Sequence, residues 1–313
     1  MIVLHLLFYL LLFVLIWYGA GLIVKAIDKF SKRIKISSFA VSFFILGILT
    51  SLPEMAVGIN SILEKDPEIF IGNLIGGIIV IFLFIIPLLA IVGNGTRLNH
   101  ELNAQKLFLS LVVIGAPALL ISDRRITSYE GILLILLYII LFYFIEKKQN
   151  LMEKIENQFE HTNINLFKDL FNIIFGVAIV FLSSRFLVEE TIYFSNILKI
   201  SPFFISLIVL SLGTNLPELL VGVRSLASGK KDIAFGDYIG SAAANTLIFG
   251  VLTVVNGKDI IIPDHFLQRF IFITLGLGFF YLFSRSKNDI SKKEGIILLT
   301  FYILFFAVEF IIK

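Results

Sequence analysis

The chain has 313 residues, of which 58% are hydrophobic and 16% are charged, and its mean hydropathy is +0.96. This composition excludes an ordinary soluble domain and is typical of a protein that crosses the membrane many times. Because there is no cysteine and the four histidines are scattered, disulfides, thiolate metal sites and histidine clusters are also excluded.

Ten predominantly apolar segments follow one another along the chain, and most approach the roughly 20 residues that a helix needs to cross a bilayer. They are Ile2–Val24, Ser37–Leu63, Ile69–Val92, Leu107–Ile121, Ile126–Ile145, Leu170–Val188, Ser201–Ala227, Ile233–Gly257, Phe270–Phe283 and Gly295–Ile312. The first segment begins without a charged region and is too long for a signal peptide, so it is predicted to be a span. The sequence therefore predicts an all-α membrane protein with ten transmembrane helices.

The sequence also contains an internal repeat. One constant offset aligns three pairs of segments: Lys35–Ser61 with Lys199–Ser225, Ile71–Gly77 with Phe235–Ser241, and Glu130–Phe142 with Glu294–Phe306. Each copy holds five spans, and an odd number of spans makes the second copy enter the membrane from the opposite side. We therefore expect two inverted five-helix repeats, residues 1–146 and 169–313, joined by a cytoplasmic linker, 147–168.

The distribution of basic residues predicts the orientation of the chain. Most of the 26 lysines and arginines lie in the loops that follow the odd-numbered spans. Basic loops are usually cytoplasmic, so the N-terminus is predicted to lie outside and the net charge of +3 does not point to nucleic acid. A compact multi-pass chain without a large regulatory loop or transit sequence fits a prokaryotic plasma membrane.

A proline followed by a glutamate interrupts the second predicted span and its copy, at Pro53–Glu54 and Pro217–Glu218. Proline lacks an N–H and displaces the carbonyl four residues earlier, so unpaired backbone oxygens are expected there. Such oxygens and a buried carboxylate are tolerated in a membrane mainly where they line a cavity or bind an ion. Inverted symmetry brings the two glutamates together, and nearby hydroxyls complete an all-oxygen site that suits Ca²⁺ or Na⁺.

A simpler interpretation is that each glutamate is protonated and bridges two helices, while the proline only kinks its helix. The duplication of the T-[SN]-L-P-E motif argues against this interpretation. The glycines at 72, 76, 236 and 240 are interpreted as close helix packing, which is compatible with an ion site.

These segments resemble the two alpha-repeats of the cation/Ca²⁺ exchanger superfamily, and most closely those of its prokaryotic sodium/calcium exchangers. That family's G-T-S-[LAM]-P-E and G-N-x-x-G-S patterns correspond to LTSLPE and GNLIGG in the first half, and to GTNLPE and GDYIGS in the second. The resemblance implies that Glu54 and Glu218 are the central cation carboxylates and contact the metal ion together with Thr50 and Thr214. It also implies further cation-binding groups: Ser51, Asn215, Ser241, Asn245 and the carbonyls of Gly47 and Ser211.

The chain departs from the family pattern at Gly77, Ile81 and Asn245, where serine, asparagine and aspartate are usual. With two fixed charges, the site is predicted to hold one Ca²⁺ or an equal charge of monovalent ions. Exchange would then be less electrogenic than in the family's sodium/calcium members, or coupled to protons.

Three other charged positions receive structural interpretations. Asp237 replaces the usual asparagine of the second glycine segment. It either caps the start of a helix, which is the favoured interpretation, or lends charge to the ion path. Arg185 is predicted to pair with a glutamate one turn further along its own helix. Glu309, close to the C-terminus, is expected to reach water.

The predicted function is a secondary antiporter that exchanges Ca²⁺ for Na⁺ or H⁺, with the first and sixth spans moving over a fixed core, as the resemblance implies. The cations are transported substrates, and no cofactor and no enzyme activity is implied; the expected partners are these cations and the lipid bilayer. Two alternatives are an exchanger of other cations, such as Na⁺/H⁺ or another divalent ion, and a degenerate protein that does not transport.

Overall fold

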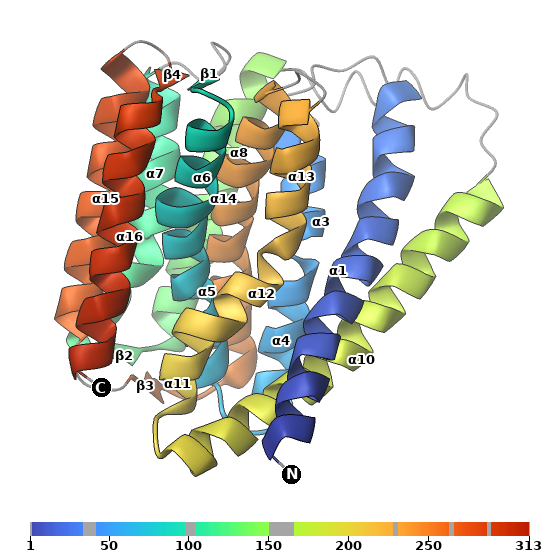
Figure 1. Cartoon of the computed structure of the whole chain (residues 1–313), viewed down its shortest axis with the longest axis vertical. Helices are drawn as coiled ribbons and strands as arrows, with labels where there is room; N and C mark the ends of the chain where they lie inside the picture. The colour runs from blue at the N-terminus through green and yellow to red at the C-terminus, as the bar shows by residue number, and fades with distance from the viewer. Residues whose placement is uncertain are drawn as a thin grey trace.

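The computed structural model describes residues 2–33, 42–97, 104–149, 166–227, 231–262, 266–286 and 289–312. Helices account for nearly all of these residues and run along the long axis of the molecule (Figure 1). The two chain ends lie at the same end of the molecule (Figure 1).

Each predicted span coincides with one helix or with one run of consecutive helices. The first half contains α1 (Ile2–Arg33), η1 (Ser42–Leu46), α3 (Gly47–Thr50), α4 (Leu52–Leu63), α5 (Glu68–Ile79), η2 (Val80–Ile85), α6 (Ile86–Val92), β1 (Thr96–Arg97), α7 (Ala104–Leu120), η3 (Ile121–Asp123), β2 (Arg125–Ile126) and α8 (Ser128–Gln149). The elements η1 and η2 are π-helical, and η3 is a short 3₁₀ turn.

The second half follows a similar order, with the single helix α14 in place of the run α5–η2–α6. It contains α10 (Leu166–Leu198), α11 (Pro202–Ile205), the π-helical η4 (Ser206–Leu210), α12 (Ser211–Thr214), α13 (Leu216–Ala227), α14 (Lys231–Asn256), β3 (Ile260–Ile261), α15 (Phe266–Ser286), β4 (Asp289–Ile290) and α16 (Lys292–Ile312). Most of the predicted linker, residues 150–165, lies outside the described residues, between the end of α8 and the start of α10.

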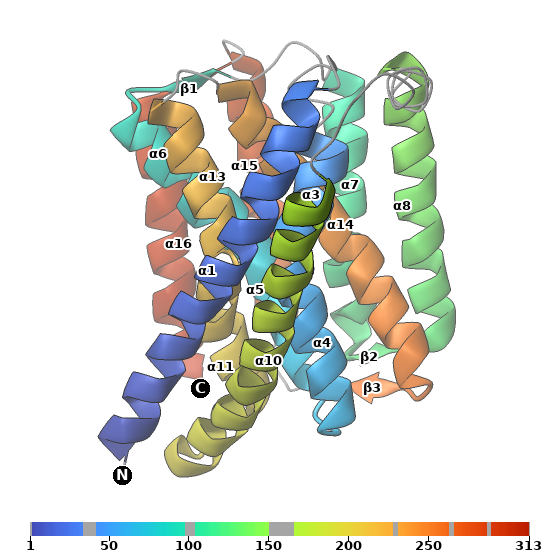
Figure 2. The same cartoon turned by 90° about the vertical axis from the view of Figure 1, so that its right-hand side faces the viewer.

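Eight helices or helix runs of the described chain are long and apolar enough to cross a bilayer. The bent pair Ser42–Thr50 and Leu52–Leu63 makes a ninth if it counts as one span. The helix α10 is not among them, although it has 33 residues and lies against α1 along much of its length (Figure 2). The described chain is therefore a mostly helical, multi-pass membrane protein.

Two short antiparallel strand pairs link the halves at opposite ends of the bundle. The strand β1 pairs with β4, and β2 pairs with β3, so each pair joins one strand from each half. Figure 1 places the first pair at the end away from the two chain ends and the second pair near them. By the sequence repeat, β1 corresponds to β3 and β2 to β4, so the two pairs are the same contact made twice.

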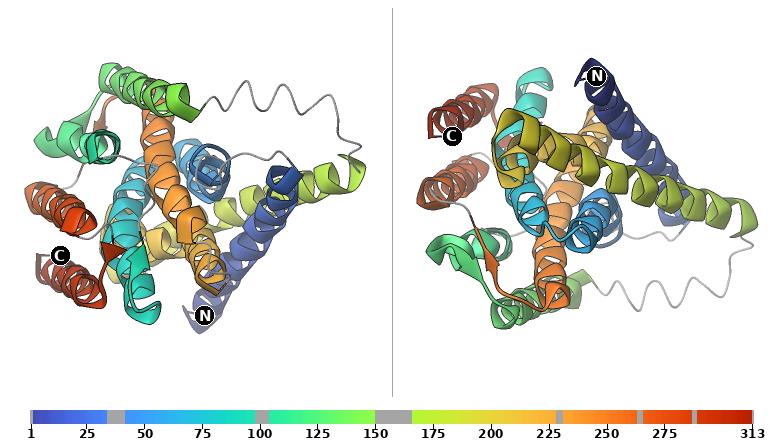
Figure 3. Two further views of the ribbon diagram at one scale, coloured as in Figure 1. Left: turned by 90° about the horizontal axis from the view of Figure 1, so that it is seen from above. Right: turned by 90° about the horizontal axis from the view of Figure 1, so that it is seen from below.

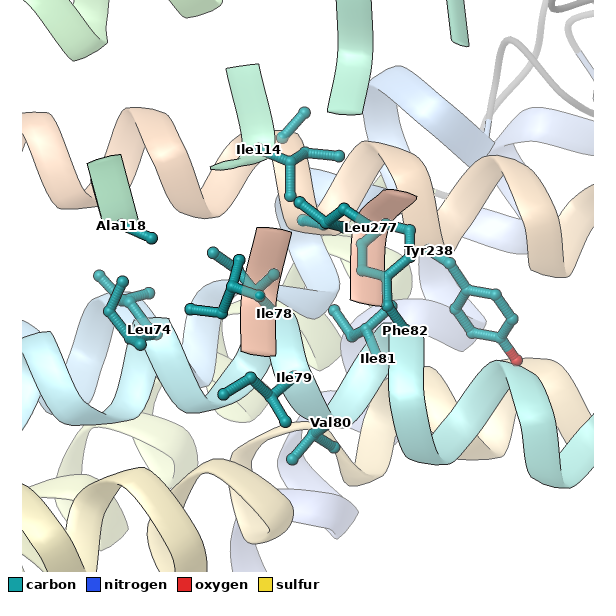
Figure 4. Close-up of a cluster of buried hydrophobic side chains, with 14 of the residues drawn as sticks. Leu74, Ile78, Ile79, Val80, Ile81, Phe82, Ile114, Ala118, Tyr238 and Leu277 are labelled. Atoms are coloured by element: carbon teal, nitrogen blue, oxygen red, sulfur yellow. The ribbon is translucent and has the colours of Figure 1, made fainter. Parts of the chain in front are cut away.

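The run α5–η2–α6 and the helix α14 lie in the middle of the bundle, surrounded by the other helices (Figure 3). Figure 4 shows the apolar packing on α5 and η2, where Leu74, Ile78 and Phe82 meet Ile114 of α7 and Leu277 of α15. The outer helices expose large apolar side chains, as expected for surfaces that face lipid. The most buried helices are therefore the two that carry the glycine segments.

Candidate cation site

Two helix runs are interrupted at matching positions near the middle of the fold. In the first half, α3 ends at Thr50 and α4 resumes at Leu52 after a bend of 40°. In the second half, α12 and α13 are separated in the same way at Asn215. Pro53 and Pro217 are each the second residue of the new helix, where a missing N–H leaves no hydrogen bond unmade. The predicted interruption at the two prolines is therefore confirmed.

Glycines let the central helices pass these broken helices at very short range. A side-chain carbon at Gly47 would lie 2.5 Å from the carbonyl carbon of Gly240 on α14. At the matching place, a side-chain carbon at Gly76 on α5 would lie 2.3 Å from the carbonyl oxygen of Leu207. Neither contact has room for a side chain, so the close-packing interpretation is confirmed for Gly76 and Gly240.

The two halves make the same hydrogen bond across the site. The Thr50 hydroxyl donates to Oδ1 of Asp237 at 3.1 Å, and the Thr214 hydroxyl donates to Oδ1 of Asn73 at 3.1 Å. All four side chains are fully buried. Each broken helix thus presents its threonine to the central helix of the opposite half.

The next residue of each broken helix differs between the halves. The Ser51 hydroxyl lies 3.2 Å from the Ser241 hydroxyl, which donates to Oε1 of Glu218 at 2.7 Å. Ser51 also donates to the Gly47 carbonyl at 2.9 Å, and Asn215 donates to the Ser211 carbonyl at 2.8 Å. The two carbonyls that were predicted as ligands therefore already accept hydrogen bonds from side chains.

Many buried polar atoms at this place have no hydrogen-bond partner among the described residues. They are both carboxylate oxygens of Glu54, Oε2 of Glu218, Oδ2 of Asp237, Oδ1 of Asn215, Nδ2 of Asn73, the Tyr238 hydroxyl, and Oδ1 and Nδ2 of Asn245. Buried polar groups in proteins are nearly always paired, and an unpaired one is costly. Their concentration between the broken helices and the two central helices marks this place as a site for a polar ligand.

The site is strongly acidic. The side chains of Glu54, Glu218 and Asp237 are each 0% exposed. The ion pairs found in the described part of the chain do not include them. Buried carboxylates inside a membrane need a compensating charge, so the arrangement suits a cation.

The acidic groups do not form a ready-made metal centre. Within the described ranges, no three histidine, aspartate or glutamate side chains converge tightly enough to hold one ion together. A site that must release its ion is expected to bind it through weak or divided contacts.

The three departures from the family pattern have distinct structural outcomes. Ile81 is fully buried within the apolar cluster of Figure 4 and offers no ligand atom. A side-chain carbon at Gly77 would lie 3.2 Å from Nδ2 of Asn215 and 3.6 Å from Nδ2 of Asn245. The two asparagines therefore occupy the space beside Gly77 that a serine side chain would enter.

The capping interpretation of Asp237 is wrong. Asp237 lies inside α14, which begins at Lys231, so its carboxylate does not cap the helix and instead faces Thr50. Asp237, Ser241 and Asn245 recur every four residues, which places them on one face of α14. That spacing favours the alternative interpretation, in which Asp237 lies on the ion path. The alignment of Asp237 on Asn73 is the sequence signal that could have added Asn73 to the candidate site.

The expectation for Glu309 is also wrong. Its side chain is 3% exposed and forms a bidentate ion pair with Arg269 on α15. The distances are 2.9 Å from Nε to Oε1 and 2.8 Å from Nη2 to Oε2. The Arg269 guanidinium also lies over the Phe203 ring, 4.8 Å from the ring centre. The predicted pair between Arg185 and Glu189 is confirmed, with an Nε to Oε1 distance of 3.2 Å.

Two broken helices that meet buried carboxylates at the centre of a polytopic bundle define a class of ion-transporting membrane protein. The sequence profile of the sodium/calcium exchanger protein family matches residues 4–146 and 168–311. The chain therefore belongs to that family, and it is a membrane transporter and not an enzyme, as the sequence predicted.

Individual relatives cover nearly the whole chain. The sodium/calcium exchanger MaX1 of Methanosarcina acetivorans is 25% identical over 100% of both chains. The inner membrane protein YrbG of Escherichia coli is 24% identical over 94% of this chain and 93% of its own. A solved structure of the sodium-calcium exchanger NCX_Mj, soaked with Na⁺ and Sr²⁺, has a TM-score of 0.72 at 23% identity and covers 98% of this chain and 99% of its own, which shows that the fold is shared.

Proposed function

We propose that the chain is a secondary antiporter that exchanges Ca²⁺ for Na⁺ or H⁺ by alternating access. The observation that carries this proposal is the pair of fully buried glutamates, Glu54 and Glu218, whose unpaired carboxylate oxygens lie beside the breaks of two matching helices. The membership in the exchanger family supports Ca²⁺ and Na⁺ as the transported ions.

Each ligand class has an assigned place in this proposal. Glu54 and Glu218 supply the charge, and Thr50 and Thr214 supply hydroxyl oxygens from the last residue before each break. Four more side chains add hydroxyl or amide oxygens: Ser51, Asn215, Ser241 and Asn245. The Gly47 and Ser211 carbonyls contribute when Ser51 and Asn215 turn away from them. All of these atoms are oxygens, which is the preference of hard cations.

We propose that the membrane-spanning architecture is two inverted five-helix repeats. In this architecture α10 is the sixth span and brings the total to ten, and the halves are divided near residues 146 and 169. Three observations support it. The breaks match in position, and the strand pairs β1–β4 and β2–β3 match across the halves. The start of α8 also matches that of α16, where Glu130 accepts a hydrogen bond from the Thr127 N–H at 2.8 Å and Glu294 accepts one from the Ser291 N–H at 2.8 Å.

The helices α1 and α10 are the proposed moving part. A side-chain carbon at Gly19 would lie 2.9 Å from the Gly176 carbonyl oxygen, so the two helices cross in close contact. Further along, the Tyr9 and Thr191 hydroxyls are 2.9 Å apart, and Nδ1 of His5 lies 3.0 Å from the Glu190 carboxylate. These contacts support motion of the two helices as one unit over the core, a shear of packed helices.

The charge distribution supports an N-terminus outside the membrane, and the prokaryotic relatives support a prokaryotic plasma membrane. A cysteine introduced at Val3, which is 68% exposed, is expected to react with an impermeant thiol reagent in intact cells. The unsubstituted chain has no cysteine and is the built-in control. If the cysteine were labelled only after the cells are opened, the N-terminus would lie inside and the proposed orientation would be wrong.

Calcium flux tests the function directly. Purified protein in liposomes should take up radioactive Ca²⁺ when an outward Na⁺ or H⁺ gradient is imposed, and the gradient that works identifies the coupling ion. Uptake should be absent without a gradient and in liposomes that contain a Glu54→Gln, Glu218→Gln double variant. Ca²⁺ uptake that depends on neither the Na⁺ gradient nor the H⁺ gradient would exclude an antiporter.

A second candidate is an exchanger of other cations on the same fold. It is favoured by Ile81, which places an apolar side chain where the family usually offers an amide oxygen. In that case Ca²⁺ flux would be absent while a Na⁺ gradient still moved protons, or another divalent ion, across the liposome membrane. A protein that does not transport would show none of these fluxes.

A further inference from the structure

Asp237 is a third carboxylate at the centre of the protein. It is 0% exposed, and only its Oδ1 atom has a hydrogen-bond partner, the Thr50 hydroxyl at 3.1 Å. Its Oδ2 atom has no hydrogen-bond partner among the described residues. A buried carboxylate with one unpaired oxygen and no basic partner among the described residues lowers the stability of the folded protein unless a cation compensates its charge.

The other half of the protein shows what this position needs for structure alone. Asn73 occupies the matching place on α5 and accepts the hydrogen bond of Thr214 at the same distance, 3.1 Å. An uncharged amide oxygen is therefore enough to hold the threonine of a broken helix. The negative charge of Asp237 adds nothing to that hydrogen-bond geometry, so it requires another explanation.

We infer that Asp237 binds a monovalent cation, Na⁺ or H⁺, beside the Glu54 and Glu218 pair, and that it is a charge-determining residue of the exchange cycle. This inference rests on the proposed function. Asp237 and Asn245 lie on the same face of α14, so the chain carries its third acid two turns away from the position where the family usually has one.

The extra carboxylate changes the charge balance predicted from the sequence. With Glu54 and Glu218 alone, one Ca²⁺ neutralises the site. With Asp237 included, the Ca²⁺-loaded site keeps one negative charge, and full neutralisation by monovalent ions needs one more ion. If Na⁺ or H⁺ replaces Ca²⁺ completely, each cycle then moves one net charge across the membrane.

The isosteric variant Asp237→Asn separates charge from structure, because Asn73 shows that an asparagine keeps the threonine hydrogen bond. Transport current and radioactive Ca²⁺ flux are measured together in liposomes, under Na⁺ and pH gradients in separate arms. The unsubstituted protein is expected to move net charge, whereas the variant should lose one elementary charge per Ca²⁺. The arm in which its driving-ion dependence changes identifies Na⁺ or H⁺ as the ion at Asp237.

Binding provides a second readout that does not depend on transport. In detergent, Ca²⁺ should raise the melting temperature of the unsubstituted protein relative to choline chloride, because a ligand of the folded state stabilises it. The half-saturating Ca²⁺ concentration should rise about 10- to 100-fold in Asp237→Asn, the range expected when a supporting carboxylate is lost.

A charge exchange supplies the matched control. The double variant Asn73→Asp, Asp237→Asn carries the acid on the opposite central helix and should recover the charge moved per Ca²⁺. Asp237→Asn with unchanged coupling and unchanged Ca²⁺ binding would overturn the inference while leaving the proposed function intact, provided that Glu54→Gln is inactive. If Ca²⁺ neither moves through nor stabilises the unsubstituted protein, the proposed function and this inference fail together.

Discussion

The two halves of the protein share one scaffold but carry different polar groups on it. In each half a π-helical turn leads to a break after a threonine, and that threonine donates a hydrogen bond of 3.1 Å to the central helix of the other half. Beyond this shared frame the residues diverge. Ser51 meets Ser241, whereas Asn215 fills the space beside Gly77, and Asp237 stands where the first half has Asn73.

This difference shows that the repeat fixes where helices break and cross, while single substitutions fix the charge of the site. The first half contributes one carboxylate, Glu54, and the second contributes Glu218 and Asp237. A symmetric backbone therefore surrounds an asymmetric charge distribution. Such asymmetry allows ions to interact differently with the two halves.

A second difference lies in the central helices. The first half contains the π-helical segment η2, whereas the corresponding part of α14 is a regular α-helix. Pro87 follows η2, and the corresponding residue of α14 is Val251. Because proline cannot donate its backbone hydrogen bond, a wider helical turn before it accommodates the carbonyl that would have accepted that bond.

The largest expected effect concerns the one acid that the halves have in common. Glu54→Gln and Glu218→Gln should each reduce Ca²⁺ flux about 100-fold or more, the size expected when a buried charge loses its partner. Glu189→Gln on the exposed side of α10 is the matched control and should transport normally. If one of the two variants kept near-normal flux, the halves would not share the ion, and the proposed site would be wrong.

The Arg269–Glu309 ion pair exists in the second half alone, because the corresponding residues of the first half are Gln105 and Ile145. Arg269→Met leaves Glu309 buried without its partner and should lower the free energy of unfolding by about 3–5 kcal/mol. The melting temperature in detergent measures this loss. The double variant Arg269→Met, Glu309→Leu should recover most of it, and an equally unstable double variant would show that packing matters more than charge.

The pair Gly77 and Asn215 can be converted to the pattern of the other half. Gly77→Ser alone should destabilise the protein by about 1–3 kcal/mol, since its side-chain carbon would lie 3.2 Å from Nδ2 of Asn215. Adding Asn215→Ser removes the obstruction and recreates the pairing of Ser51 with Ser241. Thermal unfolding of the two single variants and the double variant measures the coupling, and strictly additive effects would contradict the contact.

The smallest effect concerns a feature that the halves share. Thr127 and Ser291 each lie just before the first residue of α8 or α16, and each hydroxyl donates to the glutamate three residues later. Thr127→Ala and Ser291→Ala remove these hydroxyls. Each variant should lose about 1 kcal/mol of stability, the usual cost of a lost helix cap. Because the geometry is the same, the two losses should agree, and a clear inequality would show that the ends of the bundle differ in stability.

Much of this architecture could be predicted from the sequence. Hydropathy located every helix run that the structure contains, and the constant offset between the repeats predicted matching breaks beside Pro53 and Pro217. These features depend on local chemistry, namely apolar length and a proline that cannot donate a hydrogen bond. The family membership followed from the same motifs.

The errors concern residues whose partners are distant in sequence. Glu309 was expected to reach water because it lies near the C-terminus, but Arg269 on the neighbouring helix provides a buried partner. Asp237 was assigned to a helix start because aspartate is common there, although the predicted span Ile233–Gly257 already began before it and α14 begins at Lys231. In both cases the outcome depended on which helices pack together, and side-chain type and spacing did not determine that packing.

The strand pairs at the two ends of the bundle also constrain how the protein is made. The partner of Arg125 is Ile261 and the partner of Thr96 is Ile290, so neither strand pair can form until the later residue has been synthesised. During synthesis the N-terminal half therefore emerges with both of its short strands unpaired, and the ladder nearer the C-terminus of the chain, β1–β4, is completed only after α15 has been made. The last helical hairpin, α15 and α16, therefore completes a contact with the segment that follows α6 in the first half.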